Sequence, residues 1–193
     1  MSLEPLPIAE IGEPILRQPA ATVTREQIST PQFQAFVDRL IATMRHADGA
    51  GIAAPQVFEP LRVCVLEVRD NPRYPYKPNI PLTVLVNPTL SPRGEAQFEN
   101  YEGCLSVPNL RGVVSRHAEI DVTAWDRHGT PWKRHVKGIT AGTFQHEVDH
   151  LDGKLFVDRV HDPHSLCTWA NFKRHRETEF RRQVERIVAR YGS

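Results

Sequence analysis

The heptapeptide QHEVDHL at residues 145–151 decides how the rest of this 193-residue chain is interpreted. On a helix, His146 and His150 lie one turn apart and project from the same face, so their imidazoles can bind one metal ion. Glu147 is rotated by about 100° around that helix, which puts its carboxylate beside the metal, free to take a proton from a bound water. A solvated helix face that carries two histidines by chance would show the same pattern.

Two histidines leave a metal ion short of a third protein ligand. The zinc-protease pattern H-E-x-x-H-x-x-G-x-x-H finds its glycine at Gly153, but Phe156 occupies the position of its third histidine. The glutamates within residues 177–185 lie among arginines and are typical of surface ion pairs. The remaining candidate is Cys104, which lies in a polar, glycine-flanked turn, whereas Cys64 lies in an apolar run.

A third segment, GAGIAAPQ at residues 49–56, is neither a P-loop nor a dinucleotide fingerprint. It has no Lys-Ser/Thr pair, it follows a predicted helix, and it lacks the third glycine of the fingerprint. Taken alone, it is explained by a helix C-cap and a close-packed turn. Gln56 nonetheless offers an amide donor that can serve an oxyanion.

The composition excludes several classes of protein. The chain has 24 Lys and Arg against 23 Asp and Glu, which excludes a globally basic nucleic-acid binder, and no apolar run approaches the roughly 18 residues of a membrane span. Three widely spaced cysteines are too few and odd in number for a secreted disulfide framework. The N-terminus shows neither a signal peptide nor a transit peptide. We therefore expect a cytoplasmic protein that forms one domain over residues 1–193.

Hydrophobic periodicity and breaker residues predict the secondary structure around these motifs. Prolines make residues 1–28 an irregular arm, and Thr30 and Pro31 predict the N-cap and first residue of a helix that ends by Gly49. The other expected elements are short strands at 61–68, 82–87, 96–101, 118–125 and 132–136, a helix at about 140–151 and a C-terminal helix at about 164–190. The proline-rich segment 70–81 is expected to be a loop that folds over a neighbouring groove.

Taken together, the three motifs resemble those of the peptide deformylases. That family carries GxGxAAxQ, EGCLS and QHExDHL, and this chain shows them in that order at 49–56, 102–106 and 145–151. GEPILRQPA at 12–20 and DGKLFVDR at 152–159 also resemble family segments, so the resemblance covers most of the chain. It implies an α+β fold in which antiparallel strands surround a central metal-binding helix, with further helices at both ends.

The resemblance also implies roles for individual residues. Cys104, His146 and His150 would hold one divalent metal, typically Fe(II) in the family, with Zn, Ni or Co as substitutes. Glu147 would accept a proton from the attacking water and return it to the departing amine. The implied reaction removes the N-formyl group from the N-terminal formylmethionine of nascent polypeptides and releases formate.

The same resemblance assigns the groups that bind the substrate. The Gln56 side chain and the Leu105 backbone N–H would stabilise charge on the formyl oxygen. The peptide-binding positions are Ala50, Gly51 and Gly103 for the substrate backbone, and Ile139, Gly142 and Thr143 for the methionine pocket. The chain departs from common family patterns here, because Ala50 and the stretch before the metal helix often hold larger side chains. The shape of the pocket therefore differs from the common one.

The C-terminal segment bears a charge of its own. Residues 173–193 contain seven Lys and Arg and three Glu, although the whole chain has a formal charge of only +1. The family resemblance suggests that this basic helix docks on the ribosome, where nascent chains emerge, and a solvated helix face explains the same charges equally well.

Two alternatives remain at this point. One is a zinc peptidase that uses Glu147 in the same role and cleaves blocked or internal peptides. The other is a structural metal site in a non-catalytic protein that docks on ribosomal RNA through the basic C-terminal helix. The first differs from a deformylase in its product, and the second has no turnover.

Overall fold

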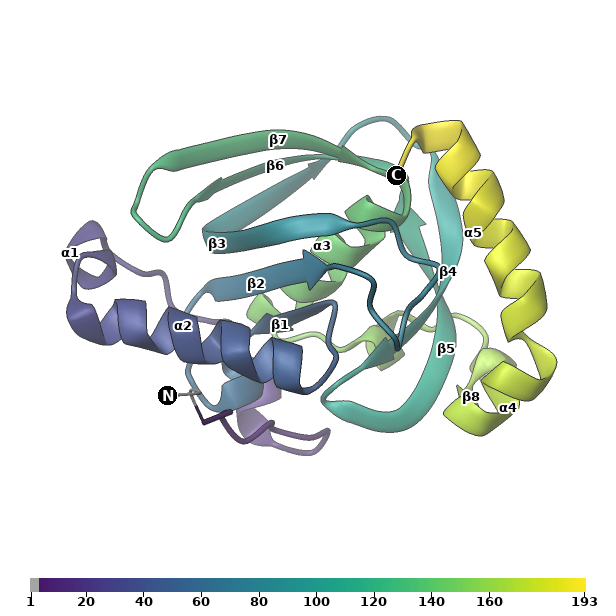
Figure 1. The fold of residues 1–193 in the computed structure, drawn as a ribbon, viewed down its shortest axis with the longest axis horizontal. Coiled ribbons are helices and arrows are strands. Elements are labelled where there is room, and N and C mark those ends of the chain that lie inside the picture. The colour runs from purple at the N-terminus through teal and green to yellow at the C-terminus, as the bar shows by residue number, and fades with distance from the viewer. Residues whose placement is uncertain (1–3) are drawn as a thin grey trace.

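A buried helix, α3 (Gly138–Leu151), packs against strands of two antiparallel sheets and is the central element of the fold (Figure 1). The structure is a computed structural model and describes residues 4–193. Helix α3 begins two residues before the predicted range of 140–151 and ends where predicted, at a left-handed Gly153 with φ of 72°. The expected α+β fold, with antiparallel strands around a central helix, is confirmed.

The strands of residues 4–193 form a five-stranded sheet in the order β1-β2-β3-β6-β7 and a three-stranded sheet in the order β4-β5-β8. The larger sheet contains β1 (Gly51–Ala53), β2 (Val63–Val68), β3 (Ile80–Pro92), β6 (Glu119–Trp125) and β7 (Pro131–Lys137). The smaller sheet contains β4 (Gln97–Cys104), β5 (Val107–His117) and β8 (Cys167–Thr168). The strands do not follow one another in a single sheet, because the β4–β5 hairpin leaves the larger sheet and forms a second layer (Figure 1).

The five predicted strands correspond to β2, β3, β4, β6 and β7, whereas the sequence pattern does not predict β1, β5 or β8. Strand β5 lacks a clean alternation of apolar and polar residues. Pro108 and Gly112 interrupt it, Asn109 adopts a left-handed φ of 58°, and its buried positions include Arg111 and Arg116. Buried arginines on a strand read as polar positions in the sequence, and only the tertiary structure shows why they lie inside.

Helix α2 (Pro31–His46) forms as its sequence predicts. The Thr30 side chain accepts a hydrogen bond from the Phe33 N–H at 3.2 Å, and Pro31 is the first helical residue. The helix ends before Gly49, because Asp48 already has a left-handed φ of 50°. The buried apolar side chains of its inner face are Phe33, Val37, Leu40, Ile41 and Met44. Helix α2 therefore covers one face of the larger sheet and supports β1.

The arm that precedes α2 contains two short helical turns. These are η1 (Pro14–Arg17) and α1 (Arg25–Ile28), and the first three residues of the predicted irregular arm lie outside the described residues. The arm is otherwise extended and hydrogen-bonds to the loops around the site, for example from Ile11 N to Ser106 O at 2.7 Å. Two further short turns, η2 (Ala54–Val57) and η3 (Phe156–Arg159), follow β1 and α3.

The C-terminal helix predicted over about 164–190 is wrong as one continuous element. A short turn, η4 (Pro163–Ser165), and strand β8 precede two helices, α4 (Trp169–His175) and α5 (Glu177–Tyr191). Residues 167 and 168 pair with β5 instead of joining a helix, and the Thr168 side chain caps α4 by accepting a hydrogen bond from Asn171 N. Tertiary pairing with a strand that the sequence pattern hides therefore breaks the helix.

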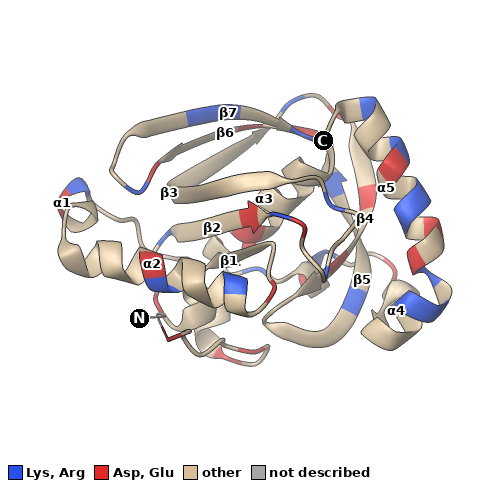
Figure 2. Cartoon of the chain, viewed as in Figure 1, with Lys and Arg blue, Asp and Glu red and all other residues tan. Residues whose placement is uncertain are grey.

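Helix α5 buries one apolar stripe and exposes its charges. Phe180, Val184 and Ile187 face inward, whereas most of the charged residues of α4 and α5 are exposed, and Figure 2 colours their positions along the two helices. The expected surface pairing of a C-terminal glutamate is confirmed, since Arg181 bonds Glu177 at 3.0 Å with both side chains partly exposed. Within residues 4–193, no helix is long and apolar enough to cross a membrane.

Candidate metal centre

The two histidines of the 145–151 motif lie together on α3, with ring centroids 5.0 Å apart. The Cys104 Sγ, at the end of β4, lies 3.3 Å from His150 Nε2. The three potential ligand atoms of Cys104, His146 and His150 all lie within 4.8 Å of one another. The structure thus brings together the two helix residues and the cysteine that the sequence placed about 40 residues upstream.

This group of donors fits a divalent metal. Metal–sulfur and metal–imidazole bonds are about 2.3 and 2.0–2.1 Å long, so three atoms this close can share one ion with little adjustment. Burial lowers the pKa of His150 well below its usual value, which keeps it in the neutral form that metals bind. Burial opposes charge on His146 as well, yet hydrogen bonds to Cys104 and Glu102 raise its pKa well above the usual value. The group therefore attracts positive charge.

A buried chain of ion pairs orients the first histidine. Glu102 accepts a hydrogen bond from His146 Nδ1 at 2.8 Å and two from the Arg116 guanidinium at 2.8 and 2.7 Å. Arg116 also donates a hydrogen bond to Asp149 at 2.6 Å, and Arg159 of η3 forms an ion pair with the same Asp149 carboxylate. Burial alone would raise the pKa of Glu102, but Arg116 and His146 hold it well below its usual value. Glu102 and Arg116 therefore form a buried ion pair beside His146.

Arg111 has a different environment from Arg116. It donates to Tyr101 O and to the Tyr76 hydroxyl, the latter at 3.0 Å, and its guanidinium lies 4.0 Å from the centre of the Phe172 ring. No ion pair of residues 4–193 includes Arg111. Its cation–π contacts instead join β5 to the C-terminal helices.

Glu147 follows His146 on α3 and lines one small cavity together with Cys104 and His146. It is 4% exposed, and its Oε2 atom has no hydrogen-bond partner within residues 4–193. Burial raises the pKa of Glu147 to about 7, in spite of His146 and Lys77 nearby. A buried carboxylate with a free oxygen and a pKa near neutrality has the properties of a general base and acid.

Gln56 lies on η2 with its amide directed at the cysteine. Its Oε1 accepts from Ala53 N at 2.8 Å, and its Nε2 lies 3.0 Å from Ser106 Oγ and 3.5 Å from Cys104 Sγ. The amide orientation is therefore fixed at both ends. Ser106 was not among the predicted site residues, yet its backbone N–H also donates to Cys104 Sγ at 3.4 Å. Its place two residues after the cysteine in EGCLS was the available signal.

Two small cavities flank the donor group, with volumes of about 30 and 20 Å³. The residues of the sequence-based prediction that line one or both are Ala50, Gly51, Gln56, Gly103, Cys104, Leu105, Gly142, Thr143, His146 and Glu147. Ile139 does not line either one, because it is 1% exposed and packs in the apolar cluster with Phe172 and Phe180. Ile139 was predicted to line the methionine pocket, whereas its side chain lies in this apolar cluster.

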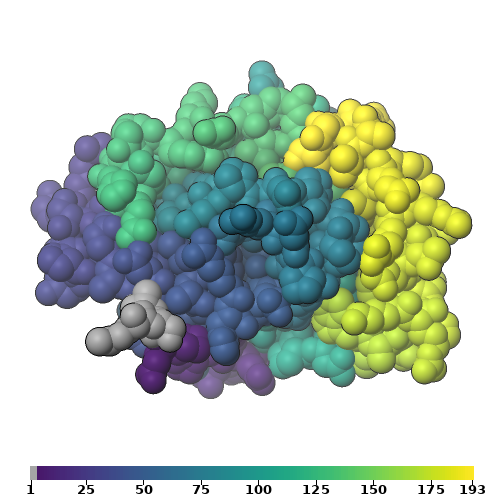
Figure 3. Space-filling view, viewed as in Figure 1, coloured from purple at the N-terminus to yellow at the C-terminus, as the bar shows by residue number. Residues whose placement is uncertain are grey.

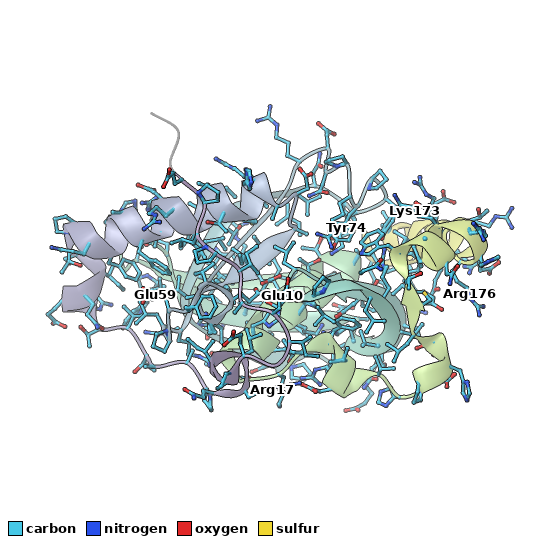
Figure 4. The ribbon with its side chains drawn as sticks, turned by 90° about the horizontal axis from the view of Figure 1, so that it is seen from below. Glu10, Arg17, Glu59, Tyr74, Lys173 and Arg176 are labelled. Carbon is cyan, nitrogen blue, oxygen red and sulfur yellow. The ribbon has the colours of Figure 1, made fainter. Side chains whose placement is uncertain are left out.

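Tyr74 and Lys77 line both cavities and were missed as candidates. Both belong to the proline-rich loop between β2 and β3, which was expected to fold over a groove and does so. Tyr74 packs against Trp169 with ring centroids 5.9 Å apart, and Figure 4 shows it beside the helical region that carries Lys173 and Arg176. The sequence signalled a loop but not which of its side chains point inward.

Comparisons with known proteins agree with this geometry. A family model described as polypeptide deformylase matches residues 5–165. The chain is 46% identical over 160 residues to peptide deformylase 2 of Nostoc sp. (strain PCC 7120), covering 83% of this chain and 88% of that protein. The Met-Ala-Ser-bound class I type b peptide deformylase from Acinetobacter baumannii superposes with a TM-score of 0.79 at 40% identity, covering 83% and 100% of the two chains. An actinonin complex of a peptide deformylase from Synechococcus elongatus covers 100% of this chain and 88% of its own, with a TM-score of 0.74 and 29% identity.

Proposed function

Because the chain belongs to the peptide deformylase family, we propose that Glu147 acts as general base and acid at the group formed by Cys104, His146 and His150. Members of this family are metal-dependent hydrolases that remove the N-formyl group of nascent polypeptides, and this is the function of the protein. The observation that carries the assignment is the buried Glu147 carboxylate, with one unpartnered oxygen, on the helix turn of the two histidines.

Cys104, His146 and His150 are our proposed ligands of the metal. A divalent ion bound there would acidify a coordinated water and polarise the formyl oxygen. We propose Fe(II) as the resident ion, with Zn, Ni or Co as substitutes, since one thiolate and two imidazoles suit each of these metals. Glu102 supports the site by holding the Nδ1 of His146, which leaves the other ring nitrogen free to bind.

Glu147 moves the proton in this proposal. It takes a proton from the attacking water as the water oxygen forms its bond to the formyl carbon. The carbon–nitrogen bond then breaks, and Glu147 delivers the proton to the departing amine, so that formate and a free N-terminus leave. A pKa of about 7 lets the same carboxylate accept and donate a proton near neutrality.

The Gln56 amide and the Leu105 backbone N–H are our proposed donors to the formyl oxygen as it gains charge. The support for Gln56 is its fixed orientation, with Oε1 on Ala53 N and Nε2 within 3.5 Å of Cys104 Sγ. A donor that is already oriented does not have to reorganise during the reaction, which is why such groups stabilise charge so effectively.

The substrate would lie across the two cavities. Ala50, Gly51 and Gly103 are proposed to bind its backbone, and Gly142 and Thr143 its first side chain, with Ile139 packed behind them. These positions surround the donor group on β1, β4 and α3. Recognition of the substrate backbone between β1 and β4 suits an extended peptide and does not depend on the side chains after the first residue of that peptide.

Three broader proposals concern the setting of the enzyme. We propose that residues 1–193 form a single catalytic domain and that the protein acts in the cytoplasm, in keeping with its bacterial relatives. We also propose that the charged outer surface of α4 and α5 docks on the ribosome. The support is that residues 173–193 of the enzyme carry seven Lys and Arg, which can bind the phosphates of ribosomal RNA. Docking there would bring the enzyme close to its nascent-chain substrates.

Product analysis tests the function directly. The protein, purified without oxygen and supplied with Fe(II), is incubated with formyl-Met-Ala-Ser, and formate and free amines are quantified. We expect equal amounts of formate and Met-Ala-Ser. Cleavage of the Met-Ala bond with the formyl group intact would support a zinc peptidase instead.

A further inference from the structure

Ser106 lies inside the molecule, next to the side chain of Gln56. The residue is completely buried, and its Oγ atom lies 3.0 Å from Gln56 Nε2. The nitrogen of a glutamine side chain only donates, so the serine oxygen is the acceptor of this hydrogen bond. The proposed reaction gives no role to the Ser106 hydroxyl, although it is a direct neighbour of the proposed donor to the formyl oxygen.

The Gln56 amide has one possible orientation. The Ala53 N–H can only donate and lies 2.8 Å from Oε1, so Nε2 must face Ser106 and Cys104. This nitrogen carries two N–H groups, and Ser106 accepts a hydrogen bond from one of them. The second is directed toward Cys104 Sγ, 3.5 Å from Nε2, on the side of a small cavity that Glu147 also lines. The Ser106 hydroxyl therefore determines where the second N–H points.

Backbone hydrogen bonds hold Ser106 and Gln56 in register. The Ser106 N–H donates to Cys104 Sγ at 3.4 Å, and its carbonyl accepts from Ile11 N at 2.7 Å. From the same N-terminal arm, Ala9 N donates to Gln56 O at 2.8 Å. Figure 3 shows the arm, in purple, at the surface on the lower edge of the molecule. The arm thus holds the two backbones, and the bond between the hydroxyl and the amide closes a ring of contacts.

A buried pair of serine and glutamine also contributes to stability, because an unpartnered amide hydrogen inside a protein is costly. The same pair of residue types occurs at the surface, where Ser115 Oγ lies 2.6 Å from Gln97 Oε1 in an exposed hydrogen bond. Gln97 lines neither small cavity, whereas Gln56 is 1% exposed and lines one of them. Only the buried pair is therefore placed to affect the reaction.

We propose that Ser106 is a positioning residue whose hydroxyl holds the Gln56 amide so that its second N–H meets the formyl oxygen. The inference rests on the proposed function, because it gives Gln56 its direction at the same site. Ser106 does not touch the substrate and acts through Gln56. Without the hydroxyl, the amide nitrogen loses its acceptor and can rotate, and a donor that must reorganise stabilises the developing charge less well.

A double-mutant cycle tests this proposal. Values of kcat and KM for formate release from formyl-Met-Ala-Ser are measured, together with metal content, for the wild type, Ser106→Ala, Gln56→Ala and the double variant. The cycle separates an effect that Ser106 exerts through Gln56 from one that it exerts independently. Ser115→Ala is the matched control, because it removes the hydroxyl of the exposed serine–glutamine pair.

We expect Ser106→Ala to lower kcat by about tenfold, with KM within about twofold of the wild-type value and the metal content unchanged. The double variant should have a kcat within about twofold of that of Gln56→Ala, because no amide is left for the hydroxyl to orient. Ser115→Ala should leave kcat and KM unchanged.

A further tenfold loss of kcat in the double variant, compared with Gln56→Ala, would overturn the proposal, because Ser106 would then act independently of the amide. An unchanged kcat in either single variant, or loss of metal from Ser106→Ala, would overturn it as well. None of these results affects the proposed function as long as the wild-type enzyme releases formate. Absence of formate from the wild-type enzyme would refute the proposed function itself.

Discussion

Gly51 and Glu147 lie so close together that a Cβ atom at position 51 would force the Glu147 side chain to move. A Cβ atom built there would lie 2.5 Å from Oε1 and Cδ of the Glu147 side chain. Strand β1 thus passes directly over the carboxylate that we propose as the base. The glycine of GAGIAAPQ is explained by this contact between two motifs that lie nearly 100 residues apart in the chain.

Gly51→Ala is therefore expected to displace the Glu147 carboxylate. We predict a fall in kcat/KM for formate release of about 100-fold, because a displacement of about 1 Å at a reacting group has effects of this size. Gly94→Ala is the control, since nothing lies within 4 Å of its Cβ position and only its left-handed φ of 79° is strained. It should lower the melting temperature slightly and leave turnover intact. Full activity of Gly51→Ala would refute the proposed position of the base.

Arg116 holds Glu102 and Asp149 together inside the molecule, with its own side chain only 2% exposed. Arg116→Met leaves both carboxylates buried without their partner, so we predict a loss of about 3 kcal/mol in the free energy of unfolding. Metal affinity should fall by about 10- to 100-fold, because His146 loses its fixed acceptor. Urea unfolding and metal titration measure the two effects.

The matched control for Arg116 is the exposed pair of α5. Arg181 bonds Glu177 with side chains 46% and 23% exposed, so Arg181→Met should change the free energy of unfolding by less than about 1 kcal/mol. Equal effects of the two arginine substitutions would show that the buried chain of ion pairs contributes nothing special to the site.

Gln56→Ala removes the fixed amide donor. We predict that kcat falls by about 100-fold or more while KM changes little, since the donor acts on charge that develops during the reaction. Gln183→Ala is the control, because that amide donates to Glu99 O in an exposed hydrogen bond and lines neither cavity. A rise in KM with kcat unchanged would mean that Gln56 only binds the substrate.

Ribosome docking is best tested by charge reversal. Removal of residues 173–193 would uncover the apolar side that α5 buries, so truncation confounds docking with folding. Exposed arginines that can be replaced by glutamate together are Arg174, Arg182 and Arg186. The control reverses three exposed charges elsewhere, at Arg39, Arg69 and Lys133. The α4–α5 variant should lose salt-sensitive co-sedimentation with ribosomes and keep formate release. Unchanged co-sedimentation, or an equal loss in the control, would argue against this surface.

Local sequence signals predicted the features that depend on contacts within one helical turn. Thr30 and Pro31 start α2 through contacts within one helical turn, and the spacing of His146 and His150 places both on one face wherever that helix lies. The motif resemblance then supplied Cys104, and the structure brings its sulfur next to His150.

Long-range contacts explain what the sequence did not reveal. Strand β5 lacks the usual alternation of apolar and polar residues because Arg116 occupies a buried position, paired with Glu102 and Asp149 from other elements. The C-terminal helix is interrupted because Cys167 and Thr168 pair with that same strand. The sequence did not indicate that Lys77, a polar residue of a proline-rich loop, would lie inside. The folded loop places it at both small cavities.

In the proposed reaction, Glu147 transfers the proton at a metal that other residues hold. The most direct measurement is formate release together with metal content for Glu147→Gln, which keeps the size of the side chain. We predict one divalent metal per chain, as in the wild type, and turnover reduced by about 1,000-fold. Turnover close to wild type with the metal bound would contradict the account, because the proton would then move by another route.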